Sequence, residues 1–362
     1  MFPTQFTGAS FTWERKELNN ILKINSGRDY KQLNSGNIPV YGTGGYMLSV
    51  NDKLSDTDAV GIGRKGTIDK PLYLKAPFWT VDTLFYCTSK ENSDVKFIYL
   101  LFQIINWKRY DESTGVPSLS KNTISNIKTY VPKIKEQDYI SKLFFSLDNT
   151  LQLHERKCEE LILIKKALLQ KLFPKRDEVR SEVRYKNFSD AWKQRKLRDV
   201  VKTTIGEFVI KTKQKEDSPY PVYNGGTSYT GFYDDYNNDS NKIIISARGA
   251  NAGFVNIVRQ RYWAGNSCYS LSILNNQEMD LDYLYQMLKQ RQHLFTDFQQ
   301  AANIPSVSKK DVETFKVYTP SFEEQKKIGL FLTRFDSLID LHQRKLEKLK
   351  QLKKFLLQNM FI

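Results

Sequence analysis

The feature that most constrains this chain is an internal duplication without a gap. Residues 116–173 return as residues 304–361, and every matched pair lies 188 positions apart. Of the 58 matched positions 23 are identical, and 13 of the other 35 exchange one apolar residue for another. A motif in the first copy, Pro117-Ser118-Leu119-Ser120-Lys121, recurs as Pro305-Ser306-Val307-Ser308-Lys309. A repeat of this length indicates two copies of one structural unit.

The similarity continues upstream with a shift that grows in small steps. Trp13 matches Trp192 at a shift of 179, and Lys65-Gly66 matches Arg248-Gly249 at 183. Short loop insertions in two copies of one fold would leave this pattern. We therefore predict globules at residues 1–135 and 188–322, helices at 136–174 and 323–362, and a charged linker at 175–187.

The two globules show the signs of short strands and turns. Apolar runs at 59–62 and 242–245 predict buried strands, and Gly, Asn, Asp and Ser separate them from further strands. One helix is expected near the end of each globule, around 97–101 and 283–287. Each globule is therefore predicted to be mixed and mostly β.

The segments that are most similar between the two copies, 136–174 and 323–362, are predicted to be long helices. Apolar sites alternate four and three residues apart over nearly five heptads, which is typical of a coiled-coil seam. Because both seams need a partner, we predict that the helices pair with each other, antiparallel, about a pseudo-twofold axis, with the globules at opposite ends. At 1.5 Å per residue, 38 residues give a spacer of about 57 Å.

Polar residues interrupt this seam at matched positions. His154 and His342 are interpreted as a register-setting polar layer, because no cysteine or acidic pair stands beside them with metal-ligand spacing. Lys165 and Lys353 are expected to extend their head groups into water. The predicted fold class is α+β, with two similar, mostly β globules separated by two long antiparallel coiled-coil helices.

The composition favours a polyanionic partner. A net charge of +15 and a pI near 9.4 point to nucleic acid. The three cysteines, Cys87, Cys158 and Cys268, fit neither a disulfide framework nor a zinc site, so a reducing cytoplasm is expected. The longest nearly apolar run, residues 97–105, is too short to cross a membrane.

Catalytic motifs are missing from the sequence. There is no phosphate-binding loop of the G-x-x-x-x-G-K-[ST] type and no Pro-Pro dipeptide, hence no Asn/Asp-Pro-Pro-aromatic element of amino-methyltransferases. Glu-x-Lys triplets lack the upstream Pro-Asp of nuclease metal sites, and two of the three histidines lie on the seam. We predict no catalytic residue, no metal site and no cofactor on this chain.

Glycine-rich turns with basic and amide side chains are the remaining candidates for chemistry. They follow buried strands in both copies, so backbone N–H groups are expected to meet phosphate while an Arg reaches a base edge. For the serines of the Pro-Ser motif, capping and turn roles are an equal alternative. Trp79 and Trp263 are interpreted as core residues. The candidate DNA contacts are Tyr41, Thr43, Arg64, Lys65, Thr67, Ser118 and Lys121 in the first copy, and Tyr223, Asn224, Thr227, Arg248, Asn251, Ser306 and Lys309 in the second.

The order of these motifs resembles a known family. Five motifs follow one another twice over nearly the whole chain: Trp-x(4)-Leu, Val-Tyr shortly before Gly-Gly, a basic-Gly turn, Pro-Ser-x-Ser-Lys and Pro-x(3)-Glu-Gln-x-x-Ile. This arrangement is similar to the DNA specificity (S) subunit of type I restriction-modification systems. The resemblance implies two target recognition domains that each read one half of a bipartite, asymmetric sequence in double-stranded DNA.

The same resemblance implies partners. Two methyltransferase (M) subunits would dock on the helices and bind S-adenosylmethionine, and restriction (R) subunits would supply ATP- and Mg-dependent translocation and cleavage. Two other interpretations stay open at this point. One is a self-sufficient, pseudo-dimeric DNA-binding regulator, and the other is a nuclease with an unrecognised site.

Overall fold

The computed structural model describes residues 13–175, 178–296 and 305–361. The parts of the predicted segments at 1–12, 176–177, 297–304 and 362 lie outside the described residues, as does Ile304, the first residue of the second copy. The chain forms two compact units. Unit 1 comprises residues 1–154 and 345–362, and unit 2 comprises residues 155–344. Both long helices therefore contribute one half to each unit.

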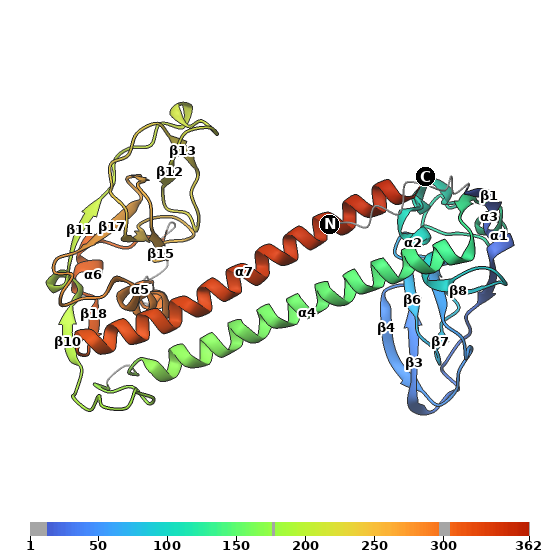
Figure 1. Ribbon diagram of the computed structural model, residues 1–362, viewed down its shortest axis with the longest axis horizontal. Helices are drawn as coiled ribbons and strands as arrows, with labels where there is room; N and C mark the ends of the chain where they lie inside the picture. The colour runs from blue at the N-terminus through green and yellow to red at the C-terminus, as the bar shows by residue number, and fades with distance from the viewer. Residues whose placement is uncertain (1–12, 176–177, 297–304, 362) are drawn as a thin grey trace. The chain divides into compact units, whose positions relative to one another are not determined.

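Unit 1 contains a globule of three small sheets and short helices (Figure 1). The four-stranded antiparallel sheet has the order β2 (Leu22–Ser26), β8 (Leu84–Ser89), β5 (Ala59–Gly63), β6 (Leu72–Leu74). The three-stranded sheet has the order β4 (Gly45–Val50), β3 (Ser35–Gly42), β7 (Trp79–Thr80), and β1 (Glu14–Glu17) pairs with β9 (Lys128–Val131). The helices are α1 (Leu18–Ile21), α2 (Val95–Ile104), η2 (Trp107–Tyr110) and α3 (Lys121–Asn126).

Unit 2 repeats this topology strand for strand. Its four-stranded sheet is β11 (Val201–Ile205), β17 (Cys268–Ile273), β14 (Lys242–Ser246), β15 (Val255–Val258). Its three-stranded sheet is β13 (Gly231–Tyr233), β12 (Tyr220–Tyr223), β16 (Trp263–Ala264), and β10 (Lys193–Lys196) pairs with β18 (Lys316–Thr319). The helices are η3 (Leu197–Asp199), η4 (Lys211–Lys213), α5 (Leu281–Gln290), η5 (Gln292–Phe295) and α6 (Lys309–Thr314).

The two long helices, α4 (Ile134–Leu172) and α7 (Phe322–Met360), have 39 residues each. Ser321 caps α7, because its hydroxyl oxygen accepts the N–H of Glu324 (3.4 Å). In unit 1 the start of α4 packs against the end of α7, where Phe144 lies near Phe361. In unit 2 Leu172 shares a buried cluster with Ile328 near the start of α7. The helices are therefore antiparallel within each unit, and the predicted fold class is confirmed.

The seam residues of the helices are buried or half-buried, as their spacing predicts. The expectation for the two seam lysines is wrong. The ammonium of Lys165 pairs with Asp336 in unit 2, and Lys353 pairs with Asp148 in unit 1 (2.6 Å). Lys165 matches Lys353, and Asp148 matches Asp336, at the shift of 188 positions. The same ion pair therefore occurs twice. The seam thus carries two reciprocal ion pairs besides the half-buried His154 and His342.

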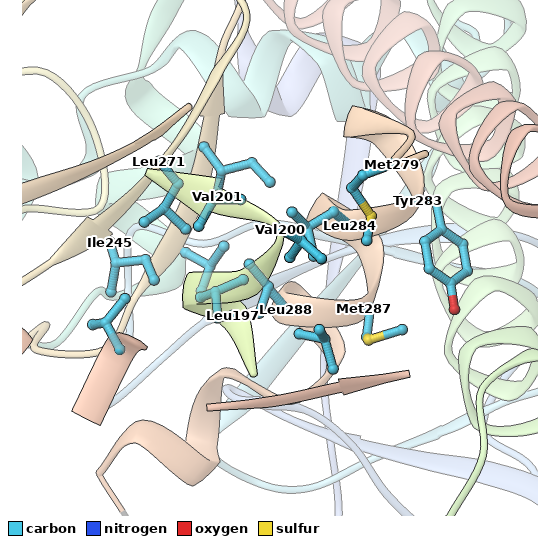
Figure 2. Packing of buried hydrophobic residues seen from close by; sticks show 14 of the residues in the cluster. Leu197, Val200, Val201, Ile245, Leu271, Met279, Tyr283, Leu284, Met287 and Leu288 are labelled. Carbon is cyan, nitrogen blue, oxygen red and sulfur yellow. The ribbon is translucent and has the colours of Figure 1, made fainter. Parts of the chain in front are cut away.

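Each globule completes its core with the end of the other copy's helix. In unit 2, Phe173 contacts Trp192 (ring centroids 6.5 Å) and Tyr283 (5.5 Å). In unit 1, Phe361 makes the corresponding contacts with Trp13 (5.9 Å) and Phe97 (5.6 Å). Figure 2 shows the unit 2 cluster, in which side chains of α5 face those of η3 and β11, with Leu284, Leu288, Leu197, Val200 and Val201 among those labelled.

The duplicated Glu-Gln pair ties each long helix to its own globule. Gln325 is 1% exposed; its amide donates to the carbonyls of Pro320 and Glu278, and its oxygen accepts the N–H of Asp280, each at 3.0 Å. Gln137 repeats this pattern in unit 1 with Pro132, Asn92 and Asp94. Since Asp94 and Asp280 cap α2 and α5, the glutamine fixes the helix entry and the globule together.

The preceding glutamate is bound differently in the two units. Glu136 accepts the indole N–H of Trp13 (3.1 Å) in unit 1. Glu324 instead accepts hydrogen bonds from Nε and Nη2 of Arg184, at 2.9 and 2.6 Å, so part of the predicted linker is anchored to α7. None of the helices among the described residues has the length and hydropathy to span a bilayer. The cysteines are all free and buried.

Candidate nucleic-acid interface

The basic-Gly turn and the Pro-Ser motif are joined in both units. In unit 1, Lys65 forms an isolated β-bridge with Ser118, and the N–H of Leu119 donates to the carbonyl of Arg64 (2.9 Å). In unit 2, Arg248 forms the same bridge with Ser306. Segments about 50 residues apart in the sequence therefore make one surface. The structural counterpart of Lys65 is Arg248, whereas the counterpart of Arg64 is the buried Ala247.

Several backbone N–H groups of these turns are already bonded to carbonyls, which contradicts the expectation that they meet phosphate. The N–H of Arg64 donates to Thr83 (2.8 Å) and that of Gly66 to Pro117 (2.8 Å). In unit 2 the N–H of Gly249 donates to Pro305 (2.9 Å). Gly66 and Gly249 have φ values of +97° and +90°, a conformation that favours glycine. These N–H groups hold the turns to neighbouring segments, so at these positions contacts with a ligand must come from side chains.

The glycine-rich hairpin lies beside the basic turn in each unit. A Cβ added to Gly66 would lie 3.8 Å from the Thr43 hydroxyl in the β3–β4 turn. In unit 2 the Ser246 hydroxyl donates to the carbonyl of Gly226 (2.9 Å), and a Cβ on Gly225 would approach the Arg248 carbonyl to 3.0 Å. Hairpin, basic turn and Pro-Ser motif thus form one continuous surface, here called the turn–hairpin face, in both units.

In unit 1 this face borders a polar pocket of about 1040 Å³, lined among others by Arg64, Lys65, Lys121, Glu112 and the buried Phe85. Arg64 and Lys121 lie 6.0 and 5.7 Å from the Phe85 ring centroid. Within the described residues Arg64, Lys65 and Lys121 form no ion pair. Their charges are therefore available to an anion. The Phe85 ring makes cation–π contacts with Arg64 and Lys121.

In unit 2 the face carries fewer cations. Arg248 is exposed and forms no ion pair with any described residue. It lies near Tyr269, whose pKa is raised by burial and lowered by the Arg248 charge. Lys309, at the start of α6, pairs with Glu313 (3.5 Å), so its charge is partly neutralised.

The remaining predicted residues have mixed roles. The Asn224 amide oxygen accepts the N–H of Ser267 (3.1 Å), which makes it a part of the frame. Burial raises the pKa of the half-buried Tyr223. The exposed side chains of Thr227 and Asn251 lie in turns, and Tyr41 and Thr67 are half-buried. Ser120 and Ser308, the second serines of the motif, cap α3 and α6, which confirms the alternative role for those two residues.

Two aromatic residues on this face were not among the sequence candidates. Tyr46, on β4, is 63% exposed, and Tyr229, between β12 and β13, is 51% exposed. They occupy matched positions 183 residues apart, directly after the glycine-rich turns. That match within otherwise divergent parts was the available signal. Trp79, by contrast, is buried and donates to the Arg28 carbonyl (2.9 Å), as a core residue should.

These observations define a duplicated protein in which one frame presents a cationic and aromatic face twice. The family model for the type I restriction modification DNA specificity domain matches residues 11–162 and again 189–351. The match covers most of the chain, and the chain belongs to this family.

Individual relatives agree with this assignment. A protein of Methanocaldococcus jannaschii named as the type I restriction enzyme MjaX specificity subunit is 24% identical over 280 residues, which is 71% of this chain and 65% of that protein. The Mycoplasma pneumoniae type I specificity subunit S.MpnORF638P is 26% identical over 155 residues, 42% of this chain and 41% of that protein. The chain thus spans less than two thirds of these relatives.

Solved structures share the fold. The crystal structure of a type I restriction-modification S subunit from M. genitalium superimposes with a TM-score of 0.78 at 17% identity, and covers 98% of both chains. A chain from a structure of type I restriction-modification complex assembly gives a TM-score of 0.52 at 15% identity, over 96% of this chain and 97% of that one. At these identities the likeness is one of fold.

Proposed function

We propose that this chain is the DNA-specificity subunit of a type I restriction-modification complex and that it reads a bipartite, asymmetric site in double-stranded DNA. The observation that carries the proposal is one frame with two sets of side chains. Unit 1 presents Arg64 and Lys65 where unit 2 presents Ala247 and Arg248. Because base edges are read by placed side chains, the same frame with different residues favours two different half-sites.

The long helices suit the role of a common scaffold. Their seam ion pairs and end contacts are the same in both units. Their outer faces leave apolar side chains exposed, among them Leu153, Leu163, Leu341 and Phe355. Exposed apolar residues in such number favour protein partners. We infer that two M subunits dock there and that R subunits join the complex.

In this proposal the chain itself is not catalytic. S-adenosylmethionine, ATP and Mg are expected in the partner subunits, and the complex acts on DNA in the cytoplasm. Among the described residues no group of His, Cys, Asp and Glu has an arrangement that could hold a metal ion. Restriction and methylation would both follow the sites that the turn–hairpin faces select.

Mapping of methylated motifs in host DNA, with and without this gene, tests the proposal. We expect one bipartite motif that disappears when the gene is deleted. A chimera that carries residues 1–135 from another family member should change one half of the motif and leave the other unchanged. A change in both halves, or no motif at all, contradicts the assignment.

Single substitutions separate base contacts from phosphate contacts. Lys65→Ala and Arg248→Ala are each expected to weaken binding of the assembled complex by about 1 to 3 kcal/mol if the side chain reads a base, with relaxed specificity in one half-site. A contact with phosphate would instead weaken binding to all sequences and lower the salt dependence by about one charge.

A further inference from the structure

Each turn–hairpin face carries an exposed ring whose role the proposed function does not state. Tyr46 and its neighbour Met47 are 63% and 48% exposed on β4, and Tyr229 is 51% exposed at the matched position of unit 2. Large apolar side chains at a hairpin tip gain nothing for the fold when they remain in water. Their recurrence in two copies that otherwise diverged points to a binding role.

The rings are supported by their surroundings. Tyr46 packs edge-on against Tyr41 (centroids 6.4 Å, 76°), and its hydroxyl lies 3.1 Å from that of Ser49. Tyr229 packs against Phe232 (4.8 Å, 50°), and the next residue donates its N–H to Val222. A ring that is already ordered loses little conformational entropy when it binds a ligand.

The charges beside the rings identify the occupant as nucleic acid. In unit 1 the Tyr46 hairpin adjoins the turn that carries Arg64 and Lys65, both exposed and without an ion pair among the described residues. In unit 2 the hairpin adjoins Arg248 in the same way. Ordered aromatic rings on a hairpin that adjoins open cations match the stacked bases and phosphates of DNA, because rings stack on or between bases while cations hold the backbone.

We propose that Tyr46 and Tyr229 each insert against a base step of their half-site and partly unstack it. The proposal rests on the proposed function and adds a mode of recognition to it. Insertion makes the cost of binding depend on how easily that step unstacks, so each half-site would be selected in part at a position without a hydrogen-bonded contact.

Fluorescence of 2-aminopurine tests this directly. The assembled complex with M subunits is titrated with duplexes that carry the mapped motif and a single 2-aminopurine at successive positions. Wild type should raise the fluorescence at one step in each half-site, outside the methylated base. Tyr46→Ala should abolish the rise in one half-site only and weaken binding about tenfold, because the loss of one stacking contact is of that order. Tyr229→Ala should do the same in the other half-site.

Matched variants make the outcomes distinct. Tyr46→Phe keeps the ring and should retain both the rise and the affinity, and Lys65→Ala should weaken binding but keep the rise. If Tyr46→Ala and Tyr229→Ala give the same rise in fluorescence as wild type and the motif is still methylated, the inference is overturned and the proposed function stays intact. Failure of these variants to assemble with M subunits also overturns it and makes the hairpins protein contacts. Wild type that binds no defined site overturns the proposed function itself.

Discussion

Replacement of Gln325 by leucine is expected to destabilise unit 2 by about 3 kcal/mol. The side chain is 1% exposed and makes three hydrogen bonds of 3.0 Å, to the carbonyls of Pro320 and Glu278 and from the N–H of Asp280. Leucine has a similar volume but leaves these three backbone groups without a partner. A neutral hydrogen bond contributes about 1 kcal/mol net, and an unsatisfied buried group costs about 1 to 3 kcal/mol, so 3 kcal/mol is the lower part of the range.

Differential scanning calorimetry of the purified chain measures the effect. For a unit of this size about 1 kcal/mol shifts the midpoint by about 2 to 4 °C, which predicts a fall of about 6 to 12 °C in one transition. Gln137→Leu should lower the transition of unit 1 in the same way, because Gln137 makes the corresponding contacts.

The control lies on the same helix. Gln351 is exposed on α7, and its amide donates to Glu347 one turn away (3.0 Å). Gln351→Leu should change stability by less than about 0.5 kcal/mol, because water replaces the lost bond. If Gln325→Leu is no more destabilising than Gln351→Leu, the glutamine does not join helix and globule, and the reasoning is refuted.

Three further outcomes follow from buried charge and burial. A double-mutant cycle on Lys165 and Asp336, with Met and Asn as replacements, should give a coupling of about 1 kcal/mol in urea unfolding, and zero coupling would contradict the ion pair. Burial lowers the pKa of Lys289 to about 8. Above that pH the unfolded chain keeps a proton that the folded chain has lost, so the free energy of unfolding should rise from about pH 8 to about pH 9.5. Lys289→Met should flatten that rise. Burial raises the pKa of Cys87 and Cys268 to about 12, so a thiol reagent should label them only after unfolding; rapid labelling of the native chain would contradict their burial.

The repeat and the helical seam could be predicted because their signals are local. A 3.5-residue period identifies the buried side of α4 and α7 regardless of partner, and apolar runs identify β5 and β14. The partner of Lys165 lies 171 residues away and has no local signal. The ion pair could nevertheless have been predicted from the duplication. Asp148 and Lys165 are both identical to the residues 188 positions later, as two reciprocal ion pairs require.

The sequence could predict residues of the candidate face, but not which of its backbone N–H groups are free to bind a ligand. Lys65, Ser118 and Thr43 come from three recurring motifs and lie close together in unit 1. The backbone N–H groups of Arg64 and Lys65 donate to the carbonyl of Thr83, and that of Ser118 donates to the carboxylate of Asp111. Turn composition does not reveal such tertiary contacts. Tyr46 was missed because single aromatic residues in strand-rich segments are usually core residues, and only burial separates the two cases.

One physical cause explains why the long helices are similar in the two copies while the globules differ. Each long helix must present Gln137 or Gln325 to its own globule, an aspartate and a lysine to the opposite helix, and a terminal phenylalanine to the core of the other copy's globule. Each of these contacts lies within one unit, and each long helix makes such contacts in both units, so the helix sequence is held by several partners at once. The exposed side chains of the turn–hairpin face, such as Lys65 and Arg248, meet no such constraint. They are free to differ between the copies, which is the property that a reader of two unlike half-sites needs.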